Sequence, residues 1–289
     1  AHKKAQVGLD GLHVLLVEDN KINQQVAREI LALVGVEVDI ADNGAVALEM
    51  IEKSSFDVIL MDLQMPEMDG YEATRRIRAD KRFDDMPIIA MTAHALQSER
   101  EKCLAAGMND HVTKPVDPDR LCTVLAEWAS RKKKAPKPDR KPSTAKTKTS
   151  AAAKAKAKTQ SKAPAPTDEK LPDEVAGIDM TAARGMIGGN EALLRRLLGD
   201  FHAKYMDLGE KVAALLEDGD IETAERTTHS LKGVSGNIRA NRIFEAAKAL
   251  DDLLRADPDS SDVPVRLKEL NEALAEVRDS LGQALNGAD

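Results

Sequence analysis

The sequence is short of cysteine and of long apolar runs. Its two cysteines, Cys103 and Cys122, lack metal-ligand spacing, so we expect buried thiols in a reducing, cytoplasmic compartment. No apolar run approaches the ~20 residues that a membrane span needs, and no signal peptide opens the chain, so we expect no membrane contact from it. The first residue is Ala rather than Met, which suggests a fragment of a longer protein that could itself be membrane-anchored.

Residues 131–162 lack any aromatic or large apolar side chain. Such a segment cannot offset its ordering entropy by burial. The net charge changes sign twice along the chain, from −9 over residues 1–130 to +12 over 131–162 and −10 over 163–289. We therefore predict two acidic domains, at 9–130 and 173–289, joined by a basic disordered linker at 131–172.

The first domain alternates short apolar runs with amphipathic stretches, which is typical of an α/β fold with a parallel sheet wrapped by helices. The apolar runs predict strands at 13–17, 36–40, 57–61, 87–91 and 111–113. Helices are expected at 21–34, 44–53, 70–79, 97–106 and 118–130. Asp117 as N-cap and Pro118 at the first helical position mark the start of the last helix.

Polar residues follow the predicted strands: Glu18 and Asp19 the first, Asp62 the third, Thr92 the fourth and Lys114 the fifth. In an open α/β sheet the site lies outside the carboxyl ends of the strands, where the strand order reverses. With the order 2-1-3-4-5, the first and third strands are neighbours, so the three carboxylates converge. Acids in one crevice repel one another, and Mg²⁺, which takes carboxylate, water and phosphate oxygens, would relieve this repulsion.

A carboxylate can act as a nucleophile and carry a phosphoryl group. Asp62 is the candidate acceptor, and Glu18 and Asp19 are candidate metal ligands beside it. Thr92 and Lys114 would contact the phosphoryl oxygens. Each residue alone has an ordinary explanation, as a helix-start charge, a turn residue or a surface residue. Their joint placement after successive strands favours the functional interpretation.

Four stretches, "VLLVEDN", "ILMDLQMPEMDG", "MTAHA" and "TKP", resemble the receiver domain of two-component response regulators in order and spacing. The resemblance covers residues 12–130. It implies a doubly wound, flavodoxin-like sheet of order 2-1-3-4-5, Mg²⁺, phosphorylation at Asp62 and a cis peptide between Lys114 and Pro115. Gln64 and His94 occupy the positions that tune phosphoryl lifetime in that family. His111 departs from the pattern, because the family commonly has Tyr or Phe there as a rotating switch.

The second domain shows apolar spacing near 3.6 residues, with helix starts at Asp179, Asn190 and Asp220. The pattern predicts helices at 179–186, 191–204, 206–218, 221–238, 241–256 and 263–286. The last four, which are longer, suit an all-α antiparallel four-helix bundle with short loops.

The stretch "HSLKGVSG" places His229, Lys232, Gly233 and Gly236 on one helix stripe, opposite the apolar residues. We expect this stripe to face solvent, so that a partner's concave site can close around the imidazole while Lys232 steadies phosphate charge. Neutral imidazole is a competent nucleophile near pH 7. An ordinary solvated histidine is the alternative. Residues 178–286 resemble a histidine phosphotransfer (HPt) domain, which implies phosphorylation of His229.

Together the two resemblances imply a phosphorelay protein, in which a phosphoryl group passes between Asp62, His229 and a receiver on another protein. The domain order resembles the C-terminal part of hybrid sensor histidine kinases, which implies an upstream histidine kinase and a downstream response regulator receiver as partners. Nothing resembles an ATP-binding kinase core, so we expect no autophosphorylation. The alternatives are a phosphate sink and a regulator whose basic linker binds nucleic acid.

Overall fold

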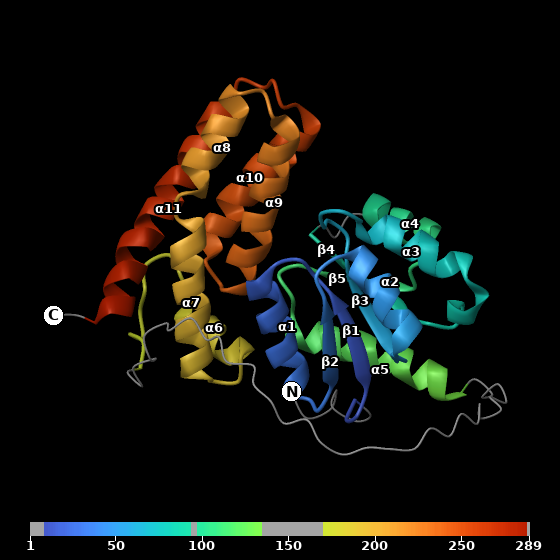
Figure 1. The fold of residues 1–289 in the computed structure, drawn as a ribbon. Coiled ribbons are helices and arrows are strands. Elements are labelled where there is room, and N and C mark those ends of the chain that lie inside the picture. Colours follow the sequence, from blue (N-terminus) through green and yellow to red (C-terminus); the bar gives the residue numbers. More distant parts are fainter. Residues whose placement is uncertain (1–8, 94–96, 135–169, 288–289) are drawn as a thin grey trace, which may run out of the picture.

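The structure, a computed structural model, describes residues 9–93, 97–134 and 170–287 (Figure 1). The strands are β1 (His13–Val17), β2 (Glu37–Ala41), β3 (Val58–Asp62), β4 (Ile88–Thr92) and β5 (Asp110–Thr113). The helices that accompany them are α1 (Lys21–Ala32), α2 (Gly44–Lys53), α3 (Gly70–Ala79), α4 (Gln97–Ala106) and α5 (Pro118–Lys134), with a short 3-10 helix η1 (Lys81–Phe83). Each strand lies within one residue of its predicted bounds.

The five strands form one parallel sheet of order β2-β1-β3-β4-β5, which confirms the predicted topology. Alternate residues point to opposite faces of the sheet, and helices cover both faces. Leu16 and Leu60 pack toward α1 and α5, whereas Leu15 and Ile59 pack toward α2, α3 and α4. Burial on both faces explains why β1, β3 and β4 read as nearly continuous apolar runs.

The C-terminal part is all-helical, as predicted. Its helices are α6 (Met180–Met186), α7 (Glu191–Tyr205), α8 (Leu208–Glu217), α9 (Ile221–Asn237), α10 (Asn241–Ala256) and α11 (Val263–Asn286). The side chains of Asp179, Asn190 and Asp220 cap α6, α7 and α9. α8 and α10 each pack between α9 and α11, and α7 adds a further contact with α11.

The folded parts extend slightly into the predicted linker. α5 continues to Lys134, beyond the expected end at 130, and Leu171 is already buried against the helical domain. Residues 135–169, the rest of that linker, lie outside the described residues. No helix among the described residues is long and apolar enough to cross a membrane.

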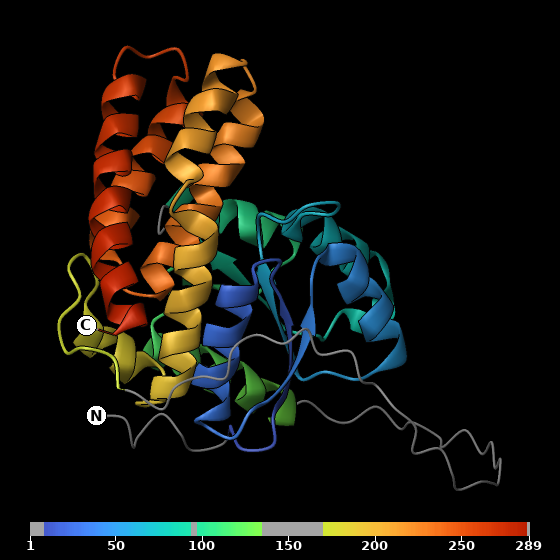
Figure 2. The ribbon, with the colours of Figure 1, turned by 60° about the vertical axis from the view of Figure 1, so that its left-hand side comes forward.

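The helical domain packs directly on the α/β domain. α7 and α9 contact α1, and α1 stands between the sheet and α7 (Figures 1 and 2). Ile22 and Val26 of α1 belong to the same buried apolar cluster as Leu197 and Phe201 of α7. The end of α9 is thereby held over the carboxyl edge of the sheet, where the predicted site residues lie.

Candidate functional site

The three predicted carboxylates meet at the carboxyl edge of the sheet. β1 pairs with β3, with Val17 opposite Met61, so Glu18 and Asp19 follow one strand beside Asp62, the last residue of the other. One carboxylate oxygen from each residue lies within 4.8 Å of the others. Glu18 and Asp62 are buried, and Asp19 is exposed. A set of oxygen donors with one open side suits a hard divalent cation.

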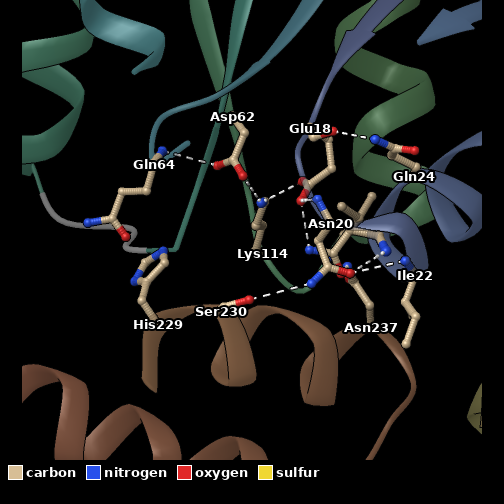
Figure 3. Close-up of polar contacts among 12 residues, drawn as sticks. Glu18, Asn20, Ile22, Gln24, Asp62, Gln64, Lys114, His229, Ser230 and Asn237 are labelled. Atoms are coloured by element: carbon tan, nitrogen blue, oxygen red, sulfur yellow. Dashed lines mark hydrogen bonds and ion pairs between the residues drawn. The ribbon is translucent and has the colours of Figure 1, made fainter. Parts of the chain in front are cut away.

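Lys114 joins this cluster from the residue after β5. Its Nζ donates to Oδ2 of Asp62 at 2.7 Å and to Oε2 of Glu18 at 2.7 Å (Figure 3). The cis peptide expected between Lys114 and Pro115 is present. Thr92 is buried at the end of β4, and its carbonyl accepts a hydrogen bond from the backbone N–H of Lys114 at 2.6 Å.

Burial dominates the electrostatics of the acidic cluster. Burial raises the pKa of Asp62 above its usual range, with added repulsion from Glu18 and Asp19 and an opposing effect of Lys114. Burial and the charge of Glu18 raise the pKa of Asp19 to about 6. Burial would lower the pKa of Lys114, but the carboxylates of Asp62 and Glu18 raise it overall. Lys114 therefore stays cationic and partly compensates the acids.

His229 of α9 lines the same pocket as Asp62 and Lys114, and its ring points toward Gln64 (Figure 3). The prediction that its stripe faces solvent was wrong, because the α/β domain of the same chain covers it. Only 14% of the His229 side chain is exposed. The histidine and the acidic site nevertheless face one another, here within one chain.

The glycines of the stripe are buried rather than exposed. A Cβ at Gly236 would lie 3.0 Å from Cβ of Pro115 and 3.0 Å from Phe244. A Cβ at Gly233 would meet Nδ2 of Asn23 at 3.6 Å, an ordinary contact distance. Gly236 therefore permits the close approach of α9 to the loop around the cis proline, whereas Gly233 leaves room for a methyl group.

Lys232 does not face outward either. Its side chain is 2% exposed, and its ammonium group pairs with the fully buried carboxylate of Asp251 on α10. The expectation that Lys232 reaches phosphate from an exposed stripe was wrong, because α10 packs closely on that side of α9. Arg255 also contacts Asp251, with Nε 3.3 Å from Oδ1.

Asp251 fixes the ring of His229. Nδ1 of His229 lies 3.2 Å from Oδ2 of Asp251, and Nη2 of Arg255 approaches the same nitrogen at 2.9 Å. Nδ1 cannot donate to the carboxylate and accept from Arg255 at once. Contacts with His229 and Lys232 hold the pKa of Asp251 at about 2 despite its burial, so Asp251 is an ionised acceptor. Pairing with this carboxylate places the proton on Nδ1 and leaves the lone pair on Nε2, and in that tautomer the Arg255 contact is not a hydrogen bond.

Burial lowers the pKa of His229 to about 4, although Asp251 opposes this effect. The imidazole is therefore neutral at pH 7 and keeps a nucleophilic nitrogen. The site thus combines a neutral nucleophile on one domain with a buried carboxylate, a lysine and a candidate cation site on the other.

Sequence reasoning missed several residues of the site. Arg226 and Ser230 of α9 line the pocket, and Asn20 bridges the domains by donating to the hydroxyl of Tyr205 at 2.6 Å. Arg226 precedes His229 by three residues, so the helical spacing could have revealed it. Asp251 lies 22 residues away on another helix, and its role had no local signal.

Three positions are expected to affect receiver behaviour, and two of them lie among the described residues. Gln64 lines the pocket, and its backbone N–H lies 3.5 Å from Oδ1 of Asp62. His111 lies on β5 with 21% of its side chain exposed. His94 lies outside the described residues. Their expected effects on phosphoryl lifetime and switching stay predictions. Cys103 and Cys122 are buried free thiols, as expected.

The match to known families agrees with this geometry. A family model of the response regulator receiver domain matches residues 14–126, and a model of the Hpt domain matches residues 196–280. The chain carries a receiver domain followed by an Hpt domain. This is the domain order of hybrid histidine kinases. The pocket therefore lies between the acidic site of the receiver domain and the histidine of the Hpt domain.

Curated relatives are much longer proteins. Probable histidine kinase 2 of Oryza sativa subsp. indica is 44% identical over 129 residues, which cover 39% of this chain and 12% of that protein. Sensor protein GacS of Pseudomonas syringae pv. syringae is 38% identical over 130 residues, which cover 44% of this chain and 14% of that protein. The chain thus spans about an eighth of the length of these relatives.

Solved structures also match the chain. The receiver domain of sensor histidine kinase PA1611 from Pseudomonas aeruginosa PAO1, with a magnesium ion in its active-site cleft, is 45% identical and has a TM-score of 0.40. That match covers 42% of this chain and 98% of the PA1611 chain. The Saccharomyces cerevisiae complex of Ypd1 with the Ssk1 receiver gives 31% identity and a TM-score of 0.41. That match covers 43% of this chain and 92% of the matched chain of the complex.

Proposed function

We propose that this chain is a phosphorelay segment that passes a phosphoryl group between Asp62 and His229, and between His229 and a receiver on another protein. The observation that carries this proposal is the shared pocket at the domain boundary, lined by Asp62 and Lys114 of the receiver domain and by His229 of the Hpt domain. A receiver domain and an Hpt domain in one chain support a phosphorelay role.

In the proposed step, the Nε2 lone pair of His229 attacks the phosphorus of the Asp62 acyl phosphate. The bond between phosphorus and the carboxylate oxygen breaks, and the electron pair leaves with Asp62. The imidazole gains positive charge as the N–P bond forms, and the Asp251 carboxylate stabilises that charge through the Nδ1 proton. The reverse step regenerates the acyl phosphate, so the direction depends on which partner supplies phosphate.

Other receiver residues would stabilise the transferring group. Lys114 already donates to Asp62 and would also contact a phosphoryl oxygen, as would the hydroxyl of Thr92 at the end of the adjacent strand. Glu18, Asp19 and Asp62 would hold Mg²⁺, because their oxygens converge and oxygen is the donor that this ion prefers. When bound, Mg²⁺ would neutralise charge on the carboxylates and the phosphoryl oxygens.

The domain pair implies a histidine kinase upstream and a response regulator receiver downstream, whose identities stay open. The two free, buried cysteines support a cytoplasmic location. Nucleic-acid binding by the basic segment has no support, and residues 135–169 lie outside the described residues. We do not propose autophosphorylation from ATP, because the two domain families found here are phosphoryl carriers and acceptors.

The test is to supply acetyl phosphate and Mg²⁺ to the wild type, Asp62→Asn and His229→Gln. We expect label on Asp62 and His229 of the wild type, on Asp62 alone in His229→Gln, and on neither residue in Asp62→Asn. The rate of His229 labelling should not depend on protein concentration, because the two groups share one chain.

Two results would count against the proposal. If label rests on Asp62 alone in the wild type, phosphorylation of the receiver domain is supported but transfer to His229 is excluded. A rate of His229 labelling proportional to protein concentration would exclude transfer within one chain. Onward transfer to a second receiver added in trans distinguishes a relay from a phosphate sink, in which no acceptor removes the label.

A further inference from the structure

A buried pair of amide side chains joins the two domains beside the transfer pocket. Nδ2 of Asn237, the last residue of α9, donates to Oδ1 of Asn23 in α1 at 2.9 Å. Oδ1 of Asn237 accepts a hydrogen bond from the backbone N–H of Val116 at 3.1 Å. The exposed fractions are 1% for Asn237 and 5% for Asn23. Water therefore cannot replace either partner while the domains are docked.

Asn23 also holds the acidic site of the receiver domain. Its Nδ2 donates to Oε1 of Glu18 at 2.9 Å, and Oε2 of Glu18 accepts from Lys114, which also donates to Asp62. Hydrogen bonds thus run without interruption from Asn237 to Asp62. Because the carboxylate of Glu18 takes the Nδ2 group of Asn23, the Oδ1 group is turned toward Asn237.

Resting on the phosphorelay function proposed above, we propose that the Asn23–Asn237 pair determines which receivers the Hpt domain accepts. An acceptable receiver presents a hydrogen-bond acceptor on α1 at the position of Asn23. A receiver with an apolar residue there leaves the buried Nδ2 of Asn237 without a partner, and an orphaned buried donor is strongly unfavourable. The pair therefore selects partly by rejecting wrong receivers.

Variants of the full chain can imitate such receivers. Asn23→Leu creates a receiver with an apolar residue at this position. Asn237→Leu removes the amide of the Hpt domain that contacts it, and the double variant removes both amide side chains. Glu29→Ala is the matched control, because it removes another contact between the domains, an exposed hydrogen bond from Asn190 at 3.1 Å. The measured quantity is the rate at which label moves from Asp62 to His229 after a pulse of acetyl phosphate with Mg²⁺.

We expect each single Leu variant to transfer about tenfold more slowly or worse, since an unpaired buried amide is left behind. The double variant should lose less than the product of the two single losses. Glu29→Ala should transfer within about twofold of the wild type, as rim contacts usually do. Labelling of Asp62 is measured separately in each variant, because Asn23 also contacts Glu18.

Strictly multiplicative losses in the double variant would overturn the proposal, as would wild-type transfer rates in either single variant. Both results presuppose that the wild type transfers label to His229. If the wild type itself fails to transfer, the proposed phosphorelay function fails instead, so the two failures are distinguishable.

Discussion

Nδ1 of His229 lies 3.2 Å from the fully buried carboxylate of Asp251. In the tautomer assigned above, Nδ1–H donates a hydrogen bond to this carboxylate, and Nε2 on the opposite edge of the ring stays unprotonated. Through this contact Asp251 selects the tautomer of His229 and orients its ring, and does not act as a general acid or base.

The variant Asp251→Asn should therefore transfer phosphate to His229 roughly 10²-fold more slowly, a loss typical of disturbed proton placement. An amide can donate to Nδ1 and so move the ring proton to Nε2. Nitrogen NMR of the labelled ring should show this change of tautomer beside the lost rate. Slower transfer with an unchanged tautomer would contradict the assigned role and indicate a purely structural effect of the lost Lys232 partner.

Acid should destabilise the chain through His229. Its pKa is about 4 in the folded chain and 6.5 as the ordinary value, so the unfolded chain binds more protons between these pH values. Stability present above pH 6.5 is then lost as the pH falls toward 4. At pH 5 the loss is about 2 kcal/mol. The ring contacts Asp251 and Arg255, and the charge of Lys232 also acts on its pKa. The other ionisable side chains that line its pocket are Glu18, Asp19, Asp62, Lys114 and Arg226.

Urea denaturation at pH 7 and pH 5 measures this loss. The wild type should show a larger drop in midpoint than His229→Gln, which has no imidazole to protonate. Equal drops in the two proteins would show that the pKa of His229 is not lowered by burial.

The two glycines of α9 should differ in their tolerance of a methyl group. Gly236→Ala places a Cβ 3.0 Å from Pro115, so we expect severalfold slower transfer from Asp62 to His229. Gly233→Ala has 3.6 Å to its nearest neighbour and should transfer like the wild type. Both substitutions favour the isolated helix by up to about 1 kcal/mol, so helix propensity does not explain a difference.

Thermal unfolding of both variants accompanies the rate measurement, because the Gly236→Ala methyl also approaches Phe244 of the Hpt domain itself. A slow Gly236→Ala variant with unchanged unfolding temperature would locate the effect at the domain boundary. Slower transfer in Gly233→Ala than in Gly236→Ala would refute the close approach as its cause.

Arg226 should act on the transferring group, because it lines the pocket three residues before His229. We expect Arg226→Ala to slow transfer to His229 about tenfold while labelling of Asp62 by acetyl phosphate is retained, since a charge-assisted contact with phosphate is lost. Arg226→Lys should recover part of the rate. Arg242→Ala is the charge-matched control, since Arg242 pairs with Glu276 outside the pocket. Equal effects of both alanine variants would indicate a general charge effect.

The sequence was sufficient for the sheet and for its acidic site. β1, β3 and β4 are covered on both faces, so their apolar runs are nearly unbroken, and the strand order alone brings Glu18 and Asp62 together. The N-cap side chains likewise contact only the first turn of the helix that follows them, so the helix starts can be predicted from the local sequence. These caps are Asp179, Asn190 and Asp220.

The environment of His229 could not be predicted in the same way. A helical stripe opposite the apolar face is expected to be exposed, but α9 is covered by α10 on one side and by the receiver domain on another. Lys232 consequently pairs with Asp251 of α10, a partner that cannot be predicted from the stretch "HSLKGVSG" alone. The Asn23–Asn237 contact joins residues 214 positions apart and exists only where the two domains meet.

α9 displays His229 on a single side, and the receiver domain of its own chain already occupies that side. In the proposed relay a second receiver would need the same position, so two acceptors would not share the imidazole. On the relay proposed here, transfer to an outside receiver requires the two domains to part, so the strength of their contact would set how long the histidine is withheld from that partner.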